Sequence, residues 1–453
     1  MKPRDRQILQ IALPSIVSNI TVPLLGLIDV AIVGHLGSPA YIGAIAVGGM
    51  LFNIIYWIFG FLRMGTSGMT SQAFGKRNLP EVVCLLLRSV GIGVAVAFCL
   101  ILLQTPIKQG AFLLIHPTDE VREMATLYFH ICIWGAPAML GLYGLTGWFI
   151  GMQNSRIPMY IAITQNVVNI IASLGLVYLC GMKVEGVALG TLIAQYAGFL
   201  MGIVLWMHNY GRLKRFWEIK NYKLKIKGGE GAGIWEKGAM FRFFQVNRDI
   251  FLRTLCLVAV TLFFTSAGEI ILAVNTLLMQ LFTLFSYVMD GLAYAGEALS
   301  GRYIGARNRE AFTDTVRHLF GWGAVIAVLF TLVYALGGNA FLGLLTDDKE
   351  VIAVADTYFY WALAVPAVGI AAFIWDGIFI GATATRGMLL SMAAAAVSFF
   401  ILYYGLHPVL ANHALWLAFL TYLLMRGVVQ TGLSREVIRR AFPSKKEPAW
   451  REG

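Results

Sequence analysis

Apolar segments long enough to cross a membrane recur along the whole of this chain, and they restrict its possible folds more than any motif does. A spanning helix needs about 20 predominantly apolar residues. The sequence contains twelve segments of that kind, at residues 8–36, 42–74, 82–105, 123–151, 157–180, 184–208, 240–266, 269–301, 311–341, 351–381, 386–406 and 411–437. With 58% hydrophobic and 13% charged residues, so many apolar segments cannot all be buried in a water-soluble core. The sequence therefore predicts an all-α polytopic membrane protein with twelve transmembrane helices.

Lysine and arginine residues gather on one side of this predicted topology. If the N-terminus is cytoplasmic, the opposite side carries only Lys108, Arg122, Lys183 and Lys349 outside the spans. Because cytoplasmic loops of membrane proteins are enriched in Lys and Arg, we expect both termini in the cytoplasm and the chain in the inner (plasma) membrane. The net charge of +11 then belongs to a basic membrane face, and no nucleic-acid partner is needed to explain it.

Two pairs of similar short motifs indicate that the chain is an internal duplication. "AFGKRN" at 73–78 resembles "YIGARN" at 303–308, and "FIGMQNSR" at 149–156 resembles "FIGATATR" at 379–386, so both pairs have the same offset along the chain. We therefore expect an N-terminal six-helix bundle, a cytoplasmic linker and a C-terminal six-helix bundle with a basic tail, at residues 1–208, 209–239 and 240–453. Bundles with an even number of spans share one topology, so these would be parallel repeats around a central cavity, as in alternating-access carriers.

Asp29 is the most unusual charge within the predicted spans. It lies in the segment "LLGLIDVAIVG", six residues after Pro23, and no basic residue lies within one helical turn of it. An ionised aspartate at membrane depth costs roughly 2.5 to 3.5 kcal/mol on insertion scales. A low dielectric favours the neutral form of a carboxyl group, which allows the group to take up and release a proton near neutral pH. Asp29 is therefore a candidate for proton or cation coupling, and an ion pair with an unseen structural partner is the alternative.

Polar side chains also follow one face of the eighth predicted span. Tyr287, Asp290 and Tyr294 are spaced by three and four residues, so they share a helical face that should line a cavity or a helix contact. Asp376 lies near the cytoplasmic end of the tenth span, where ion coupling and a structural role are both open. Asp249 and Arg253 stand four residues apart, a spacing that favours a local ion pair.

The remaining polar residues of the spans give no sign of catalysis. Asn166 and Asn169 in the fifth span are neutral, and hydrogen bonds between helices are the simplest interpretation for them. The five cysteines and seven histidines lack the spacing of a metal site, a disulfide framework or a catalytic cluster. We therefore expect no enzyme and no bound cofactor or metal, and a solute carrier is the leading interpretation.

Several stretches carry a resemblance to a known family of carriers. They are "LPSIVSNITVPLLGLIDVAIVGHLG" in the first span, "EGVALGTLIAQY" in the sixth, "NRDIFLRTLCL" in the seventh, "DGLAYAGEALSG" in the eighth and "WDGIFIGAT" in the tenth. Through them the chain resembles, over essentially its whole length, the multidrug and toxic compound extrusion (MATE) transporters and among these the DinF-like branch. The resemblance implies a secondary active antiporter that exports organic, often cationic or amphipathic compounds while protons or sodium ions flow inward.

The resemblance also implies roles for particular residues. Asp29 matches the aspartate taken as the proton site of the N-terminal bundle, and Asn169 and Thr191 match polar residues of the fifth and sixth helices. Asp376 matches a tenth-helix aspartate that some members use for cation coupling. Many DinF-like sequences carry a second aspartate four residues after the fifth-helix asparagine, where this chain has Ser173. The loss of that carboxylate favours protons over sodium, although Asn169, Ser173 and Thr191 could still offer oxygen ligands to sodium.

Exchange of protons for substrate is the mechanism that we expect. A proton and a cationic compound would compete for Asp29, and the first helix would repack about Pro23 as the charge changes. The partners would be a small organic substrate and the lipid bilayer, and the chain would act as a monomer. We expect each bundle to contribute a polar cavity, lined by Asn166, Asn169, Ser173 and Thr191 in the N-terminal bundle and by Tyr287, Asp290, Tyr294 and Asp376 in the C-terminal bundle.

Three alternatives follow from the same residues. An exporter of organic anions would hold a carboxylate with Arg63, Arg248 or Arg253. A flippase for lipid-linked sugars, from the same larger superfamily, would usually carry many more basic residues in its cavity. A membrane-embedded enzyme would need a cluster of nucleophile, base or metal ligands, which the spacing of the histidines does not offer.

Overall fold

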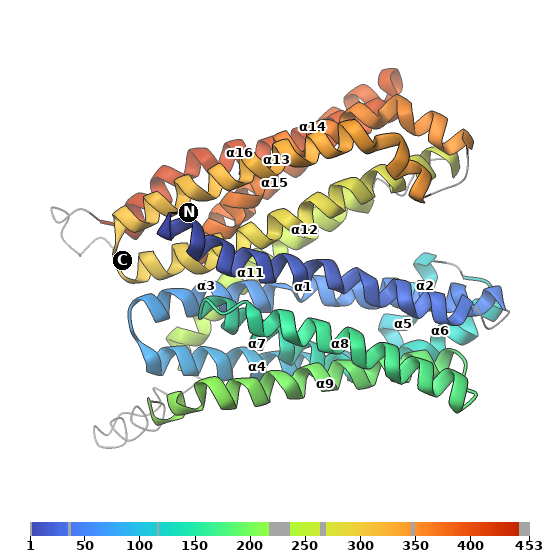
Figure 1. The fold of residues 1–453 in the computed structure, drawn as a ribbon, viewed down its shortest axis with the longest axis horizontal. Coiled ribbons are helices and arrows are strands. Elements are labelled where there is room, and N and C mark those ends of the chain that lie inside the picture. The colour runs from blue at the N-terminus through green and yellow to red at the C-terminus, as the bar shows by residue number, and fades with distance from the viewer. Residues whose placement is uncertain are drawn as a thin grey trace. The chain divides into compact units, whose positions relative to one another are not determined.

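A computed structural model of the chain describes residues 2–34, 38–115, 117–216, 236–262, 269–345 and 349–443, and within these ranges it contains helices and no strand (Figure 1). The helices of the first half are α1 (Pro3–Gly34), α2 (Pro39–Ile58), α3 (Phe61–Gly75), α4 (Leu79–Leu102), α5 (Gln104–Ile115), α6 (Asp119–Cys132), the 3-10 turn η1 (Ile133–Gly135), α7 (Ala136–Gly151), α8 (Arg156–Leu174), the π-helical turn η2 (Gly175–Leu179), α9 (Val184–Tyr210) and the 3-10 turn η3 (Gly211–Leu213). The helices of the second half are α11 (Lys237–Leu262), α12 (Glu269–Gly305), α13 (Arg309–Leu345), α14 (Lys349–Gly381), α15 (Thr385–Leu410) and α16 (Asn412–Ala441).

Ten helical segments of the described residues are long and apolar enough to cross a membrane. They fall on ten of the twelve predicted spans, all except 8–36 and 240–266. Helices α1 and α11 cover those two positions, and α11 carries Arg248, Asp249 and Arg253 in its middle. The chain is thus a multi-pass, all-helical membrane protein. The spans are less uniform than the sequence suggested, because 42–74 breaks into α2 and α3, and η1 interrupts 123–151 just before Pro137.

The chain packs as two compact units. Unit 1 consists of Met1–Ile16, Ser71–Arg77 and Phe244–Gly453, and unit 2 of Val17–Thr70 and Asn78–Phe243. Helix α1 therefore contributes its first part to unit 1 and its second part to unit 2. The predicted bundles at 1–208 and 240–453 were defined by the repeated motifs, whereas the two units are defined by contacts between residues. The predicted domain boundaries therefore stay a prediction. Of the predicted linker at 209–239, residues 217–235 lie outside the described residues.

The backbone carries a clear signature of the duplication. Arg77 and Arg307 have φ angles of 56° and 54°, and Gln153 and Thr383 have φ angles of 65° and 53°. Each of these left-handed residues follows the end of a helix, and its N–H donates to the carbonyl three residues earlier at 2.8 to 3.0 Å. A left-handed conformation is costly for residues with a Cβ, so its recurrence at corresponding positions of the repeated motifs reflects a repeated helix ending.

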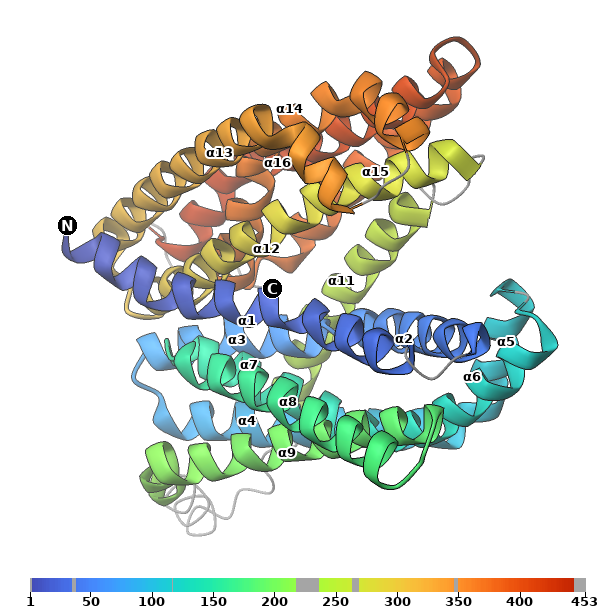
Figure 2. The ribbon, with the colours of Figure 1, turned by 45° about the vertical axis from the view of Figure 1, so that its right-hand side comes forward.

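Each unit is held together by long helices that lie side by side. In unit 2, α8 packs on α9 and α4 packs on α7 (Figures 1 and 2). The buried Trp148 anchors the second pair, because its indole Nε1 donates to the carbonyl of Val82 at 2.8 Å. The buried indole N–H stabilises the packing of α4 on α7 only while the Val82 carbonyl accepts its hydrogen bond, because an unsatisfied buried donor is costly.

In unit 1, α14 packs against both α12 and α16. Asn275 lies near the start of α12, and Asn412 is the first residue of α16. Their side-chain amides donate to each other at 2.9 and 3.0 Å. Trp416 Nε1 donates to the same Asn275 oxygen at 2.9 Å. These buried hydrogen bonds fix the register of α12 against α16.

The first turn of α1 is attached to α13 by polar contacts within unit 1. Asp5 Oδ1 lies 2.7 Å from His318 Nδ1 and accepts a hydrogen bond from Trp322 Nε1 at 3.1 Å. The hydrogen bond from His318 holds the pKa of Asp5 below its usual value. The start of α1 is therefore anchored to the second half of the chain.

Candidate functional site

Asp29 lies at the centre of a small buried polar cluster in unit 2. Its side chain comes from α1 and is only 3% exposed. Thr191 Oγ1, from α9, donates to Asp29 Oδ2 at 3.2 Å, and Asn169 Nδ2, from α8, donates to Thr191 Oγ1 at 3.1 Å. Three helices thus bring Asp29 together with Asn169 and Thr191, the two polar residues of the N-terminal bundle that the resemblance also matched.

The cluster holds a carboxylate without a compensating cation. No ion pair of Asp29 occurs within the described ranges, and its Oδ1 atom has no hydrogen-bond partner there. The buried Oδ1 of Asn169 and Oγ of Ser173 are also without a partner in that part of the chain. An ionised carboxylate in such surroundings is costly, and protonation or an incoming cation relieves the cost.

Close packing of α8 on α9 places these side chains within reach of one another. A Cβ at Gly190 would lie 2.1 Å from Ser173 Oγ and 2.8 Å from the Ser173 backbone nitrogen. Only a glycine therefore allows α9 to approach α8 this closely, one residue before Thr191. Asn169 and Ser173 share the facing side of α8 because they are four residues apart.

Replacement of Gly190 by alanine should accordingly loosen this contact. The added methyl group meets backbone as well as side chain, so we expect a loss of about 1 to 3 kcal/mol in unfolding free energy. Gly49, in α2, provides the matched control, because a Cβ added there would have no atom within 4 Å. Thermal unfolding of both variants in detergent measures the effect. A Gly190→Ala protein as stable as Gly49→Ala would contradict the packing described here.

Helix α6 adds two residues that the sequence analysis missed. Tyr128 and Cys132 are buried and lie within electrostatic range of Asp29. A Cβ at Gly48 of α2 would lie 2.4 Å from the Tyr128 ring, so the glycine makes room for it. Nothing in the sequence marks these residues as neighbours of Asp29, because helix packing alone brings them there.

Asn166, also predicted to line the polar cavity, is turned differently. Its Nδ2 atom donates to the carbonyl of Ala162 on its own helix at 2.9 Å. The predicted hydrogen bond to another helix is therefore not formed by this donor, and Asn166 is no part of the hydrogen-bonded chain from Asn169 to Asp29.

Asp376 is held in a second buried cluster, in unit 1. Its Oδ2 atom accepts hydrogen bonds from Arg253 Nη2 of α11 and from Arg426 Nη2 of α16, the latter at 2.5 Å. Its Oδ1 atom accepts from Gln430 Nε2 at 2.5 Å. The Arg426 guanidinium also lies over the rings of Phe373 and Tyr422, 5.9 and 5.6 Å from their centres. A cation could reach Asp376 only by displacing two guanidinium groups.

This cluster corrects two interpretations of the sequence. The predicted local pair of Asp249 and Arg253 is wrong, because Arg253 turns to Asp376 while Asp249 takes Arg248 at 3.0 Å and the hydroxyl of Thr385 at 3.1 Å. Arg426 is also not part of the basic cytoplasmic tail expected for the C-terminal bundle, because it is buried within α16. The four-residue spacing of Asp249 and Arg253 could not reveal the actual pair, because it says nothing of Asp376 on another helix.

Helix α12 carries the three polar residues for which the sequence predicts a shared face. Tyr287, Asp290 and Tyr294 are half-buried on one helical face. Asp290 lies within electrostatic range of Tyr287 and also of Arg426, which connects this face to the Asp376 cluster. In the described ranges, no group of three His, Cys, Asp or Glu side chains could hold a metal ion.

Comparison with known proteins identifies the family. The MatE family model matches residues 14–174 and 249–405. The chain belongs to the MatE family. DNA damage-inducible protein F of Escherichia coli (strain K12) is 38% identical to this MatE protein over 428 residues, which are 94% of this chain and 90% of the relative. The resemblance to MATE transporters of the DinF-like branch is confirmed, and the chain is a transporter and not an enzyme.

More distant members agree with this assignment. Multidrug export protein MepA of Staphylococcus aureus (strain MW2) is 19% identical to this MatE chain over 358 residues, 78% of this chain and 76% of MepA. The solved structure of the eukaryotic MATE transporter AtDTX14 superposes with a TM-score of 0.81 at 15% identity, covering 97% of this chain and 98% of that one. At this identity the likeness supports the fold alone.

Proposed function

We propose that this transporter exports organic compounds in exchange for protons, with Asp29 as the group that binds the proton. The observation that carries the proposal is a buried carboxylate that accepts a hydrogen bond from Thr191 and has no ion pair within the described part of the chain. Such a group changes charge readily, and a cationic substrate would compete with the proton for it. Proton entry from outside would neutralise Asp29 and release the compound, and proton loss inside would restore the affinity.

Sodium coupling is the alternative to proton coupling, and one observation supports it. Asp29 Oδ1, Asn169 Oδ1 and Ser173 Oγ are buried oxygen atoms without hydrogen-bond partners in the described ranges. Sodium, like other hard cations, binds several oxygen ligands at once. We favour protons because Asp29 is the single carboxylate among these groups, so the site offers a sodium ion one full charge.

The anion-exporting and flippase alternatives have less support. Of the three arginines that could hold an acidic group, Arg253 is bound to Asp376 and Arg248 to Asp249. Arg253 could bind a substrate only by breaking a buried ion pair, and the exposed Arg248 would have to leave or share the carboxylate of Asp249. We further propose that the chain acts as a monomer in the inner membrane with both termini cytoplasmic, as its basic loops and its E. coli relative suggest. The proposal involves no cofactor and no nucleic acid.

Efflux from proteoliposomes under separately imposed gradients tests the proposed function. We expect a proton gradient alone to drive transport of cationic compounds, and a sodium gradient at constant pH to have no effect. A panel that includes matched cationic and anionic compounds decides the substrate charge in the same experiment. Transport that follows the sodium gradient and ignores the proton gradient would refute proton coupling and support the alternative.

A further inference from the structure

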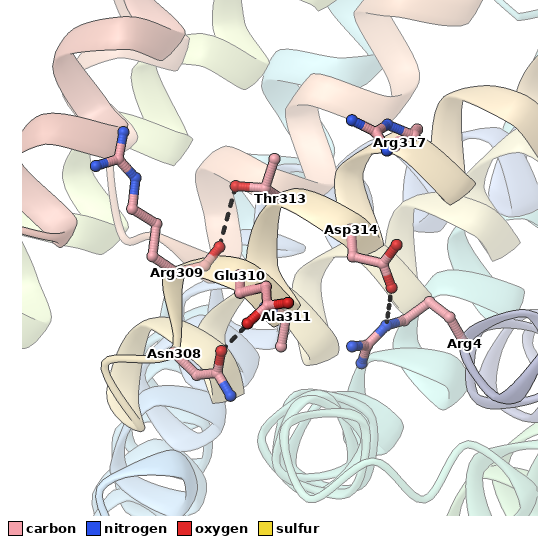
Figure 3. A pocket seen from close by; sticks show the side chains of 8 residues that line it. All are labelled: Arg4, Asn308, Arg309, Glu310, Ala311, Thr313, Asp314 and Arg317. Carbon is pink, nitrogen blue, oxygen red and sulfur yellow. Dashed lines mark hydrogen bonds and ion pairs between the residues drawn. The ribbon is translucent and has the colours of Figure 1, made fainter.

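A basic pocket lies in unit 1 where α13 begins, on the side that the charge distribution predicts to be cytoplasmic. Figure 3 shows the side chains that line this pocket. The volume of the pocket is about 780 Å³. It is lined by Arg4 of α1, Asn308 before α13, and Arg309, Glu310, Ala311, Thr313, Asp314 and Arg317 of α13. Three arginines and two acidic residues thus line one opening. The pocket shares no residue with either of the buried clusters described above.

Arg4 is held in place at the edge of this pocket. Its Nε atom pairs with Asp314 Oδ2 at 3.0 Å, and its Nη1 atom donates to Gln7 Oε1 at 2.9 Å and to the hydroxyl of Tyr303. The guanidinium also lies 4.8 Å from the centre of the Tyr303 ring. The Arg4 charge is therefore largely used within the protein, and Asp314 is neutralised by it.

Arg309 and Arg317 differ from Arg4 in this respect. Both are exposed, and the structure records no ion pair for either within its described ranges. In Figure 3 no dashed line reaches either guanidinium group. Arg317 exerts only a longer-range attraction on Asp314. Two positive groups with unused donors are thus available to a ligand, and Glu310 is the one acidic group of the pocket without a recorded ion pair in the described residues.

The exposed face of α13 continues from these arginines into the membrane. Arg309, Thr313 and Arg317 follow one another at intervals of four residues and are exposed. Farther along the helix, from residue 321 to 338, the exposed side chains are apolar, and they include Val325, Val328, Leu329, Leu332, Val333 and Leu336. Residues 309–338 are one of the candidate spans. The pocket therefore lies at the end of an exposed apolar stripe on a candidate membrane span.

We propose that this pocket binds the phosphate-containing headgroup of an anionic phospholipid, with Arg309 and Arg317 as the binding residues. The guanidinium group suits a phosphate because it presents several N–H donors in a plane. The positive end of the α13 dipole adds to the attraction. The apolar stripe favours a lipid over free phosphate, because acyl chains can lie along α13 below the headgroup. Basic pockets between helices on the cytoplasmic side are where such lipids bind membrane proteins.

Binding of defined lipids to the full-length protein tests this site. The purified chain is titrated with phosphatidylglycerol, with phosphatidylcholine or with inorganic phosphate, and bound lipid is counted by native mass spectrometry together with the thermal unfolding midpoint. We expect phosphatidylglycerol to bind and to raise the midpoint, and the other two to have little effect. In the Arg309→Gln/Arg317→Gln protein the apparent affinity should fall about thirtyfold, from two surface arginines at the usual contribution of each.

Two further variants make the result specific. Arg386→Gln removes an exposed arginine of unit 1 at the start of α15, outside the pocket, and should bind phosphatidylglycerol like the unmodified chain. Arg309→Lys/Arg317→Lys keeps the charge and should retain most of the binding. Equal loss in Arg386→Gln and in the double glutamine variant would overturn the proposal, as would unchanged binding in the latter. A midpoint shift with inorganic phosphate equal to that with lipid would indicate a phosphate site instead. A shift that depends on protein concentration would indicate a second copy of the chain.

Discussion

Asp29→Asn should reduce proton-driven efflux to the level measured without a gradient. Asparagine keeps the size of the side chain and can still accept the hydrogen bond from Thr191, but it cannot change charge between pH 5 and pH 9. The variant would resemble the permanently protonated state, so it should bind a cationic substrate weakly and show no dependence of binding on pH. Proteoliposome efflux and substrate binding over a pH series measure both properties.

A matched control separates this effect from damage to the protein. Asp356→Asn changes an exposed carboxylate of α14 and should leave efflux unchanged. Asp29→Glu keeps a carboxyl group on a longer side chain and should preserve part of the proton response. If Asp29→Asn folds normally and still pumps with a proton gradient, another group binds the proton and the proposed function is wrong.

The fold was predictable from the sequence because its cause is almost wholly local. Apolar segments of about 20 residues must span the bilayer as helices, and this requirement does not depend on how they pack. The duplication was visible for a related reason, since its motifs fall on helix endings whose left-handed residues, such as Arg77 and Arg307, constrain the local sequence. The division of α1 between two units could not be predicted, because it depends on contacts made by side chains such as Asp5 with distant helices.

The candidate site was predictable only in part. Asp29 stands out in the sequence because a charge in an apolar segment is rare, and the resemblance supplied Asn169 and Thr191. Tyr128 and Cys132 beside Asp29 could not be found, because a buried tyrosine or cysteine is ordinary in a helical core. The spacing along α11 predicted the wrong partner for Arg253, because the actual partner, Asp376, lies on another helix, α14.

The two halves of the chain have diverged in their chemistry, although the left-handed helix endings recur in both. At the offset of the repeated motifs, Asp29 corresponds to Ala259 and Asn169 corresponds to Phe399, so unit 1 has no copy of the Asp29 cluster. Unit 1 instead holds a carboxylate whose charge is already neutralised by arginines. A carboxylate that is neutralised inside the protein has less need to exchange a proton, which makes Asp376 a structural group in our interpretation.

Asp376→Ala should then destabilise the protein strongly, by about 3 to 5 kcal/mol, because it leaves two buried guanidinium groups without their shared carboxylate. Asp356→Ala, on the same helix but exposed, should change the unfolding free energy by less than about 0.5 kcal/mol. Chemical unfolding in detergent measures both values.

Removal of the whole ion cluster distinguishes a structural role from ion coupling. In the protein with Asp376→Leu, Arg253→Met and Arg426→Met, no buried charge is left without a partner, so most of the lost stability should return. If Asp376 is structural, this triple variant should also transport in response to a proton gradient, because Asp29 and its neighbours are unchanged. If the triple variant is stable but no longer transports, Asp376 or its arginines take part in coupling, as the resemblance to other members implied. The outcome depends on which carboxylate has a charge that is free to change, and we propose that this carboxylate is Asp29.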